Sequence, residues 1–327
     1  MARPILVIDD EPANRALLKE LLSAEGYAVA GAPDGRSALE EFPRLQPDLV
    51  LLDVLMPDLD GLEVCRRLKS NPDTRLTPVL LVTSLTDAKD RLRGIEAGAD
   101  GFISKPVDVN ELLPRVRSLL SLKTYTDELE RVEKVLFTLA RSIEARDSYT
   151  IGHCERVSEN AVELGGRIGL GEEEIATIRR AGLVHDLGKV AIPDFVLVKP
   201  GSLTPEERRL VEQHPVVGES ICAPLKSFQK VLPIIRHHHE KQDGSGYPDG
   251  LRGENIPLTA RVIQIVDVFD ALTSERHYRS ALPHPEALRI MESEVAKGWW
   301  DPRLFAEFKR MLAKSDRSAE LPSLALK

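Results

Sequence analysis

All of the histidines in the sequence lie in one region. The eight lie between His153 and His284, and three of them are consecutive at 237–239, directly before the glycine-rich run EKQDGSGYPDG. An amphipathic helix cannot bury three adjacent side chains, because they point in different directions. Asp186 and Asp267 lie in the same region, each near the end of an apolar run. Imidazole and carboxylate groups in apolar surroundings are costly unless something pairs with them, and a shared metal ion does so. The pattern therefore predicts a metal site.

Helices are the elements that would position these ligands, since helical bundles build metal sites from side chains on facing helices. The run VIQIVDVFDALTSERHYR at 262–279 predicts a helix with Asp267 and Asp270 one turn apart on a single face. The run TPEE at 204–207 has the residue types of an N-cap, a first-turn proline and a capping box. The helix that begins there is expected to carry His214 late in its length.

A second group of polar residues follows apolar runs in the N-terminal part of the chain. The runs are 5–10, 48–61, 78–84 and 101–106, and helix-like patterns such as 14–26 lie between them. Alternating buried strands and helices predict a parallel sheet with helices on both faces, whose site lies at the carboxyl ends of the strands. Crowded carboxylates there predict Mg²⁺, with a lysine and a hydroxyl left to hold phosphoryl oxygens. The polar side chains at those ends are Asp9, Asp10, Asp53, Thr83 and Lys105.

Residues 1–121 resemble a response-regulator receiver domain, a doubly wound α/β fold of the flavodoxin-like type. The acidic pair, the Met56–Pro57 pair and the Lys105–Pro106 pair carry the resemblance. It implies that a cognate sensor histidine kinase directs phosphorylation to Asp53. The Mg²⁺ ligands that it implies are Asp10, Asp53 and the backbone carbonyl of Leu55. The switch residues that it implies are Asp9, Thr83, Phe102 and Lys105.

A regular apolar seam follows the first domain. Its residues recur at spacings of three and four over three heptads, with charged residues on most of the other faces. The spacing indicates a long helix and favours a two-chain coiled coil, which would make the protein a homodimer. The alternative is a single helix that packs on a neighbouring domain, and Val135 beside the seam widens the stripe in that direction. The seam residues are Leu122, Tyr125, Leu129, Val132, Leu136, Leu139 and Ile143.

Residues from 144 onward resemble an HD-GYP domain, the all-helical HD-superfamily phosphohydrolase that cleaves cyclic di-GMP. The resemblance rests on HDLGK at 185–189, HHE at 238–240, GYP at 246–248 and DVFDALTS at 267–274. It implies two metal ions that share Asp186, and Fe, Mn, Ni or Zn each suit such a histidine-rich set. The other implied ligands are His153, His185 and Asp267 for one ion, and His214, His238 and His239 for the second.

The resemblance also sets the expected chemistry. Two ions about 3.5–4 Å apart can activate a water and clamp the attacking and leaving oxygens of a phosphodiester. His237 matches no ligand position, and Tyr149 stands where some family members hold a third metal through a glutamate, so we expect two metals. The implied catalytic residues are Asp186, Lys189 and Asp270. The implied substrate contacts are Lys189, Tyr247, Arg276 and Arg279.

The sequence thus predicts a two-component response regulator that hydrolyses cyclic di-GMP to pGpG, GMP or both, under the control of Asp53. Two alternatives stay open. One is a non-catalytic module that binds a cyclic dinucleotide or a protein, and the other is the same chemistry on another cyclic dinucleotide or on linear pGpG. Diguanylate cyclase (GGDEF) proteins are expected as partners.

Length and composition give the remaining expectations. A chain of 327 residues favours two domains, and a net charge of −8 argues against general DNA binding. The three cysteines form no C-x-x-C pair, and no apolar stretch has the length of a membrane span. A soluble, cytoplasmic protein is therefore expected. The predicted parts are a receiver domain at 1–121, a helical linker at 122–143, an HD-GYP domain at 144–314 and a flexible tail at 315–327.

Overall fold

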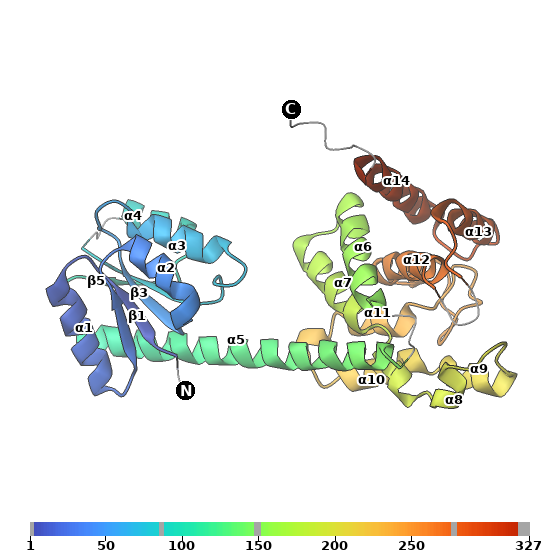
Figure 1. Ribbon diagram of the computed structural model, residues 1–327, viewed down its shortest axis with the longest axis horizontal. Helices are drawn as coiled ribbons and strands as arrows, with labels where there is room; N and C mark the ends of the chain where they lie inside the picture. The colour runs from blue at the N-terminus through green and yellow to red at the C-terminus, as the bar shows by residue number, and fades with distance from the viewer. Residues whose placement is uncertain (1–2, 85–87, 147–151, 276–279, 320–327) are drawn as a thin grey trace. The chain divides into compact units, whose positions relative to one another are not determined.

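The computed structural model describes residues 3–84, 88–146, 152–275 and 280–319. It contains two compact units, residues 1–132 and 133–327, and each is described by itself (Figure 1). The first is an α/β unit and the second is helical, which confirms the predicted fold class. The exact domain boundaries stay a prediction, because the two units divide inside one helix, α5 (Val109–Glu144).

A parallel sheet of five strands forms the centre of the first unit, in the order β2-β1-β3-β4-β5. Four strands coincide with the apolar runs, but β2 has no such run. Its sequence is VAGA, it lies at the sheet edge, and only one of its residues is buried. The strands are β1 (Ile5–Ile8), β2 (Val29–Ala32), β3 (Leu49–Asp53), β4 (Val79–Thr83) and β5 (Gly101–Ser104).

Helices cover both faces of this sheet, as predicted. Side chains alternate along each strand, so Ile5 and Val7 join the core under α1 and the start of α5, whereas Leu6 and Ile8 join the core under α2 and α3. The helices before α5 are α1 (Pro12–Ala24), α2 (Gly35–Leu45), α3 (Gly61–Ser70) and α4 (Ala88–Glu96). The carboxyl ends of the central strands therefore meet at one edge, where the predicted acidic site should lie.

Helix α5 contains the whole predicted seam, but the seam residues have two different environments. Leu136 and Ile143 are buried in the core of the second unit together with Ala140, which the seam does not include. The C-terminal part of α5 thus packs on the core of the second unit, as expected for a single helix that packs on a neighbouring domain. The other five seam residues are 43–65% exposed; they are Leu122, Tyr125, Leu129, Val132 and Leu139.

One hydrophobic core holds the second unit together, and α6, α7, α11, α12 and α14 all contribute to it. The longer helices are α6 (His153–Arg167), α7 (Glu172–Val184), α12 (Leu258–Thr273), α13 (His284–Ala296) and α14 (Pro302–Ala319). The shorter elements are η1 (Leu187–Ala191), α8 (Asp194–Leu197), α9 (Pro205–Val211), α10 (His214–Cys222), η2 (Lys226–Phe228), α11 (Leu232–His237) and η3 (Gly253–Asn255). Helix α14 continues past the predicted start of the tail at 315. Within the described residues, no helix combines the length and the apolar character needed to cross a membrane.

Two glycines allow elements of this unit to approach closely. A Cβ on Gly182 would lie 2.5 Å from the Cα of Ser158, so α7 packs directly on α6. A Cβ on Gly188 would lie 1.9 Å from the carbonyl oxygen of His214, so η1 packs on the start of α10. These contacts bring segments that carry histidines and aspartates next to one another.

Two helix predictions were wrong in their extent. The helix predicted over 262–279 runs from Leu258 to Thr273, and Ser274 after it has extended backbone. Thr204 and Glu207 form the predicted capping box of α9, but this helix ends at Val211, and His214 begins the separate helix α10. Pro215 explains the break, because a proline fits only in the first turn of a helix, and Pro215 lies in the first turn of α10.

Candidate metal centre

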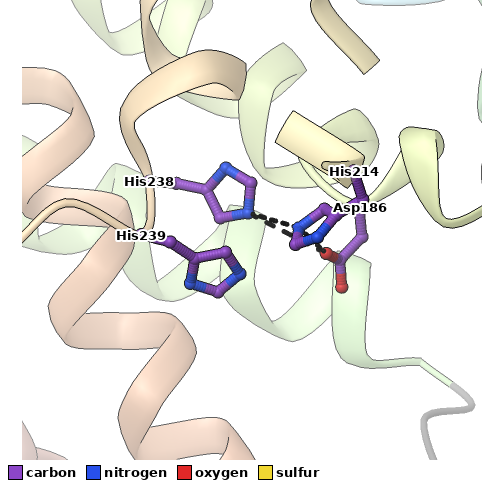
Figure 2. A group of neighbouring side chains, drawn as sticks. All are labelled: Asp186, His214, His238 and His239. Atoms are coloured by element: carbon purple, nitrogen blue, oxygen red, sulfur yellow. Dashed lines mark hydrogen bonds and ion pairs between the residues drawn. The ribbon is translucent and has the colours of Figure 1, made fainter. Parts of the chain in front are cut away.

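Two groups of histidine and aspartate side chains lie next to each other in the second unit. The first consists of His153, His185 and Asp267, and the second consists of Asp186, His214, His238 and His239. Within each group, the potential ligand atoms lie within 4.8 Å of one another. Figure 2 shows the second group, in which the paired histidines of one segment face His214 and Asp186. These are the two ligand sets that the sequence resemblance implied.

Asp186 lies between the two groups, with one oxygen directed to each. Its Oδ2 is 3.5 Å from Nε2 of His185 and 3.9 Å from Nε2 of His153. Its Oδ1 is 3.3 Å from Nε2 of His214 and 3.9 Å from Nε2 of His238. A carboxylate in this position can bridge two cations, one on each side.

Backbone carbonyls orient three of the imidazoles. The Nδ1 atoms of His185, His214 and His238 lie 2.9, 2.7 and 2.6 Å from the carbonyl oxygens three residues earlier in the chain. An Nδ1–H that donates to a carbonyl leaves Nε2 with its lone pair free to bind a metal. All three Nε2 atoms are directed toward Asp186, so backbone carbonyls orient three of the seven potential ligands.

His153 is oriented differently, by a carboxylate. Its Nδ1 lies 2.7 Å from Oδ2 of Asp270, while its Nε2 lies 3.3 Å from Oδ1 of Asp267. Arg156 binds the same Asp270 carboxylate through Nε at 2.6 Å and Nη2 at 2.9 Å. Asp270 therefore lies behind the imidazole, where it can orient His153 as the outer partner of a ligand. Sequence reasoning missed Arg156, although it belongs to the H-x-x-R sequence that begins at His153.

The protonation states of three imidazoles and two carboxylates also favour cation binding. Burial lowers the pKa of His185 and His238, and lowers that of His239 to about 3, so these imidazoles are neutral near pH 7. Burial by itself would raise the pKa of Asp186 and Asp267, but the neighbouring cationic groups hold both below the ordinary value. Neutral imidazoles around ionised carboxylates are the forms that bind metals.

Two polar atoms at the centre support the same conclusion. Within the described residues, neither Nε2 of His185 nor Oδ1 of Asp186 has a hydrogen-bond partner, although both are buried. A buried polar atom without a partner costs about 1–3 kcal/mol. A metal ion bound by each group would pair with these atoms, so the residues present fit a dinuclear centre.

The other predicted site residues of this unit lie around the centre or outside the described residues. Lys189 lies on η1, and its Nζ pairs with Oδ2 of Asp186. The Tyr247 ring lies 4.9 Å from that of His239, measured between centroids. Arg276, Arg279 and Tyr149 lie outside the described residues.

His237 belongs to neither group of potential ligands. It lies beside Glu240 and Asp249, and both of these carboxylates are already occupied. Glu240 accepts hydrogen bonds from the backbone N–H groups of Asp249 and Leu251, at 2.7 and 3.0 Å. Asp249 pairs with Arg236.

The strand ends of the first unit form a separate acidic site. One carboxylate oxygen from each of Asp9, Asp10 and Asp53 lies within 4.8 Å of the others. Lys105 Nζ lies 2.9 Å from Oδ2 of Asp9 and 2.6 Å from Oδ2 of Asp53. Burial raises the pKa of Asp53, although Lys105 opposes the shift.

The remaining predicted receiver residues lie near this acidic site or on the adjacent strands. The backbone N–H of Leu55 donates to Oδ1 of Asp53 at 3.2 Å. Thr83 is buried at the end of β4. Phe102 lies on β5 with its ring close to Gly94 of α4.

Two known protein families match this chain, one in each part. The family described as HD domain matches residues 138–304, and the response regulator receiver domain matches residues 5–117. The cyclic di-GMP phosphodiesterase response regulator RpfG of Xanthomonas campestris is 38% identical over 91% of this chain and 85% of its own length. A cyclic di-GMP phosphodiesterase of Thermotoga maritima is 32% identical over 94% of this chain and 90% of its own length. The 3′3′-cGAMP-specific phosphodiesterase 3 of Vibrio cholerae is 36% identical over 58% of this chain and 42% of its own length.

Proposed function

Because the chain belongs to the family of response regulators that join a receiver domain to an HD domain, we propose that it is a metal-dependent phosphodiesterase acting on cyclic di-GMP. The observation that carries the proposal is the position of Asp186, whose two oxygens face two separate ligand groups. Two relatives that match most of the chain are named as cyclic di-GMP phosphodiesterases, which supports this substrate.

The centre that we propose holds two metal ions bridged by Asp186. His153, His185 and Asp267 complete the first subsite, and His214, His238 and His239 complete the second. Fe, Mn, Ni or Zn would suit these ligands. When bound, two such ions lower the pKa of a shared water and offset the charge of the attacking and leaving oxygens. A third metal is not part of the proposal, because Tyr149 replaces the glutamate that would bind it.

Lys189 and Tyr247 are the substrate contacts nearest to this centre. The Lys189 ammonium, beside the bridging carboxylate, would neutralise a phosphate oxygen as charge develops in the transition state. The Tyr247 ring, next to His239, would contact the sugar or the base. Arg276 and Arg279 complete the proposed contacts, since guanidinium groups bind phosphate or the guanine edge in bidentate fashion. The products would be pGpG, GMP or both.

Phosphorylation of Asp53 by a sensor histidine kinase would regulate this activity. Mg²⁺ would be held by Asp10, Asp53 and the carbonyl of Leu55, and Lys105 already lies at the phosphoacceptor. Thr83 would bind a phosphoryl oxygen, and Phe102 would respond to that change. The receiver domain implies a kinase as a partner. Diguanylate cyclase (GGDEF) proteins are further proposed partners.

The exposed part of the α5 seam supports a proposed homodimer. Five apolar side chains at heptad spacing remain in contact with solvent in one chain, and a second copy would cover them. Sedimentation equilibrium tests this directly. A monomer mass at micromolar concentration, unchanged by Leu129→Asp, would contradict the dimer.

Product formation is the test of the proposed reaction. Protein purified without oxygen and loaded with Mn²⁺ or Fe²⁺ is mixed with cyclic di-GMP, and the products are separated by chromatography. We expect pGpG or GMP from the wild-type protein and neither from Asp186→Ala. Tight binding of cyclic di-GMP without any product, with either metal, would contradict the proposal and favour the non-catalytic signalling module.

A second candidate substrate has its own support. The relative named as a 3′3′-cGAMP-specific phosphodiesterase matches more than half of this chain. The ligands of a metal centre fix the reaction at phosphorus and leave the base undecided. Parallel kcat/KM measurements with cyclic di-GMP, 3′3′-cGAMP and linear pGpG decide among them, and a larger value for either of the last two would replace our proposal.

A further inference from the structure

The C-terminal end of α5 reaches the first turn of the helix that carries His153. Glu144, the last residue of α5, is buried, and its Oε1 accepts a hydrogen bond of 3.1 Å from the backbone N–H of Cys154. Burial raises the pKa of Glu144, and hydrogen bonds from the backbone amides of Cys154 and His153 oppose that shift. The Glu144 carboxylate thus accepts hydrogen bonds from the first backbone N–H groups of α6.

These amides need an acceptor from elsewhere in the chain. The first N–H groups of a helix have no partner inside the helix and are usually satisfied by the side chain of the N-cap residue. The N-cap residue of α6 is Gly152, which has no side chain. The Glu144 carboxylate therefore takes the place of the missing cap, from a different helix.

The end of α5 also lines a small cavity beside the first subsite. Ala140, Ile143 and Glu144 line the same small cavity as His153, Asp186 and Lys189. Arg146, two residues after the end of α5, forms hydrogen bonds with the segment that follows η1. Its Nη2 donates to the carbonyl oxygen of Ile192 at 3.0 Å, and its Nε donates to Oδ1 of Asp194 at 3.1 Å. The end of α5 thus contacts the first turn of α6, which carries His153, and the segment that follows η1.

We propose that Glu144 is a positioning residue for the first metal subsite, where it fixes the first turn of α6 so that His153 faces Asp186 and Asp267. The inference rests on the proposed dinuclear centre and deepens it. Helix α5 begins at Val109 in the receiver unit, and Glu144 joins its other end to the segment that carries His153, a ligand of the first subsite alone. A change in α5 would thereby alter the His153 subsite while the subsite of His214, His238 and His239 keeps its metal.

The test is a Co²⁺ titration of the full-length protein under nitrogen, followed by the visible absorption of bound Co²⁺ and by the number of ions retained per chain. We expect two ions for the wild-type protein. In Glu144→Ala, the affinity of one ion should fall by about 10- to 100-fold, the usual effect of losing a residue that orients a ligand. The spectrum of the remaining ion should match that of His153→Ala, which keeps only the second subsite.

Two further variants serve as controls. Glu133→Ala removes another glutamate of α5 that is attached to the second unit, since Glu133 pairs with Arg180 at 3.0 Å. This variant should keep both ions with wild-type affinity. Glu144→Gln keeps an amide oxygen that can accept the same hydrogen bond, and it should restore most of the lost affinity.

The outcomes separate this inference from the proposed function. Two ions bound with wild-type affinity by Glu144→Ala would overturn the positioning role and leave the metal centre intact. Equal loss of both ions in Glu144→Ala and in Glu144→Gln would also overturn it, because that result indicates general unfolding of the domain. Fewer than two ions in the wild-type protein would instead contradict the proposed dinuclear centre.

Discussion

At the scale of single residues, the candidate centre differs in how its histidines are held. Backbone carbonyls orient His185, His214 and His238, so no side-chain substitution outside these residues removes that support. His153 depends instead on the carboxylate of Asp270, which Arg156 holds in turn. Among these four histidines, His153 is therefore the one whose orientation depends on the side chains of other residues.

Replacing Asp270 tests this dependence. Asp270→Asn should lower kcat/KM for cyclic di-GMP by about 10- to 100-fold, the range found when a residue that orients a metal ligand is lost. The far-ultraviolet circular dichroism should stay unchanged, because the amide keeps the size of the side chain. Wild-type activity with a full complement of metal in this variant would show that His153 needs no support from Asp270.

Protons and metals should compete at the first subsite. Burial would lower the pKa of His153, but hydrogen bonds with Asp267 and Asp270 raise it to about 10. A metal must displace that proton. At pH values below 10, the affinity of the first subsite for the metal should therefore rise about tenfold for each unit by which the pH is raised. His238 and His239, with lowered pKa values, have no such proton to lose near neutral pH.

A pair of Co²⁺ titrations one pH unit apart measures this difference. His239→Ala weakens the second subsite and isolates the first, and His153→Ala does the reverse. The first subsite should gain affinity at the higher pH and the second should change little. Equal affinity of the first subsite at both values would mean that His153 carries no competing proton.

At the scale of elements, close contact between η1 and α10 positions Asp186 against His214. Gly188→Ala would place a methyl group 1.9 Å from the carbonyl oxygen of His214, so the two segments would have to separate. We expect a loss of about 1–3 kcal/mol in the free energy of unfolding, as for other overpacked sites. Denaturant unfolding measures the loss, and the metal content should fall with it.

Gly166→Ala is the matched control for this substitution. Gly166 lies inside α6, and apart from its chain neighbours and the backbone of its own helix no atom would lie within 4 Å of an added Cβ. Alanine should stabilise this helix by up to about 1 kcal/mol relative to glycine. Equal stability changes in the two variants would contradict the role assigned to the Gly188 contact.

Some elements could be predicted from the sequence because a local pattern determines them. Strands β1, β3 and β4 are buried on both faces and therefore read as apolar runs, whereas the edge strand β2 has the sequence VAGA with one buried residue. The seam indicated a long α5, but its spacing could not show that Leu136 and Ile143 would face the protein's own core.

The candidate ligands could be predicted because the residue types needed for a metal are rare in apolar surroundings. The residues that orient these ligands could not be predicted, because they come close to the ligands only when the chain is folded. Arg156 contacts Asp270 across 114 positions, and neither residue has a local signal for the other. The break before His214 had a local signal in Pro215, which the capping box of the preceding helix obscured.

At the scale of the whole molecule, the receiver domain and the HD domain share one continuous helix, and regulation would have to act through α5 or through contacts between the domains. The buried Asp53 beside Lys105 is the proposed origin of the signal. A small-molecule phosphodonor such as acetyl phosphate, added with Mg²⁺, should change the rate of cyclic di-GMP hydrolysis by the wild-type protein.

Asp53→Asn should abolish the response to the phosphodonor, because the amide cannot accept a phosphoryl group. The comparison is the ratio of rates with and without acetyl phosphate, measured for both proteins. A ratio near one is expected for the variant. The same change in rate in wild type and variant would exclude Asp53 as the control point.

Anomalous X-ray diffraction from crystals of protein purified without oxygen is the most direct measurement of the proposed centre. Data collected at the absorption edges of the bound metals should give two peaks, one on each side of the Asp186 carboxylate. One peak should lie among His153, His185 and Asp267, and the other among His214, His238 and His239. A single peak, or no peak, in crystals of protein that still hydrolyses cyclic di-GMP would contradict a dinuclear centre bridged by Asp186.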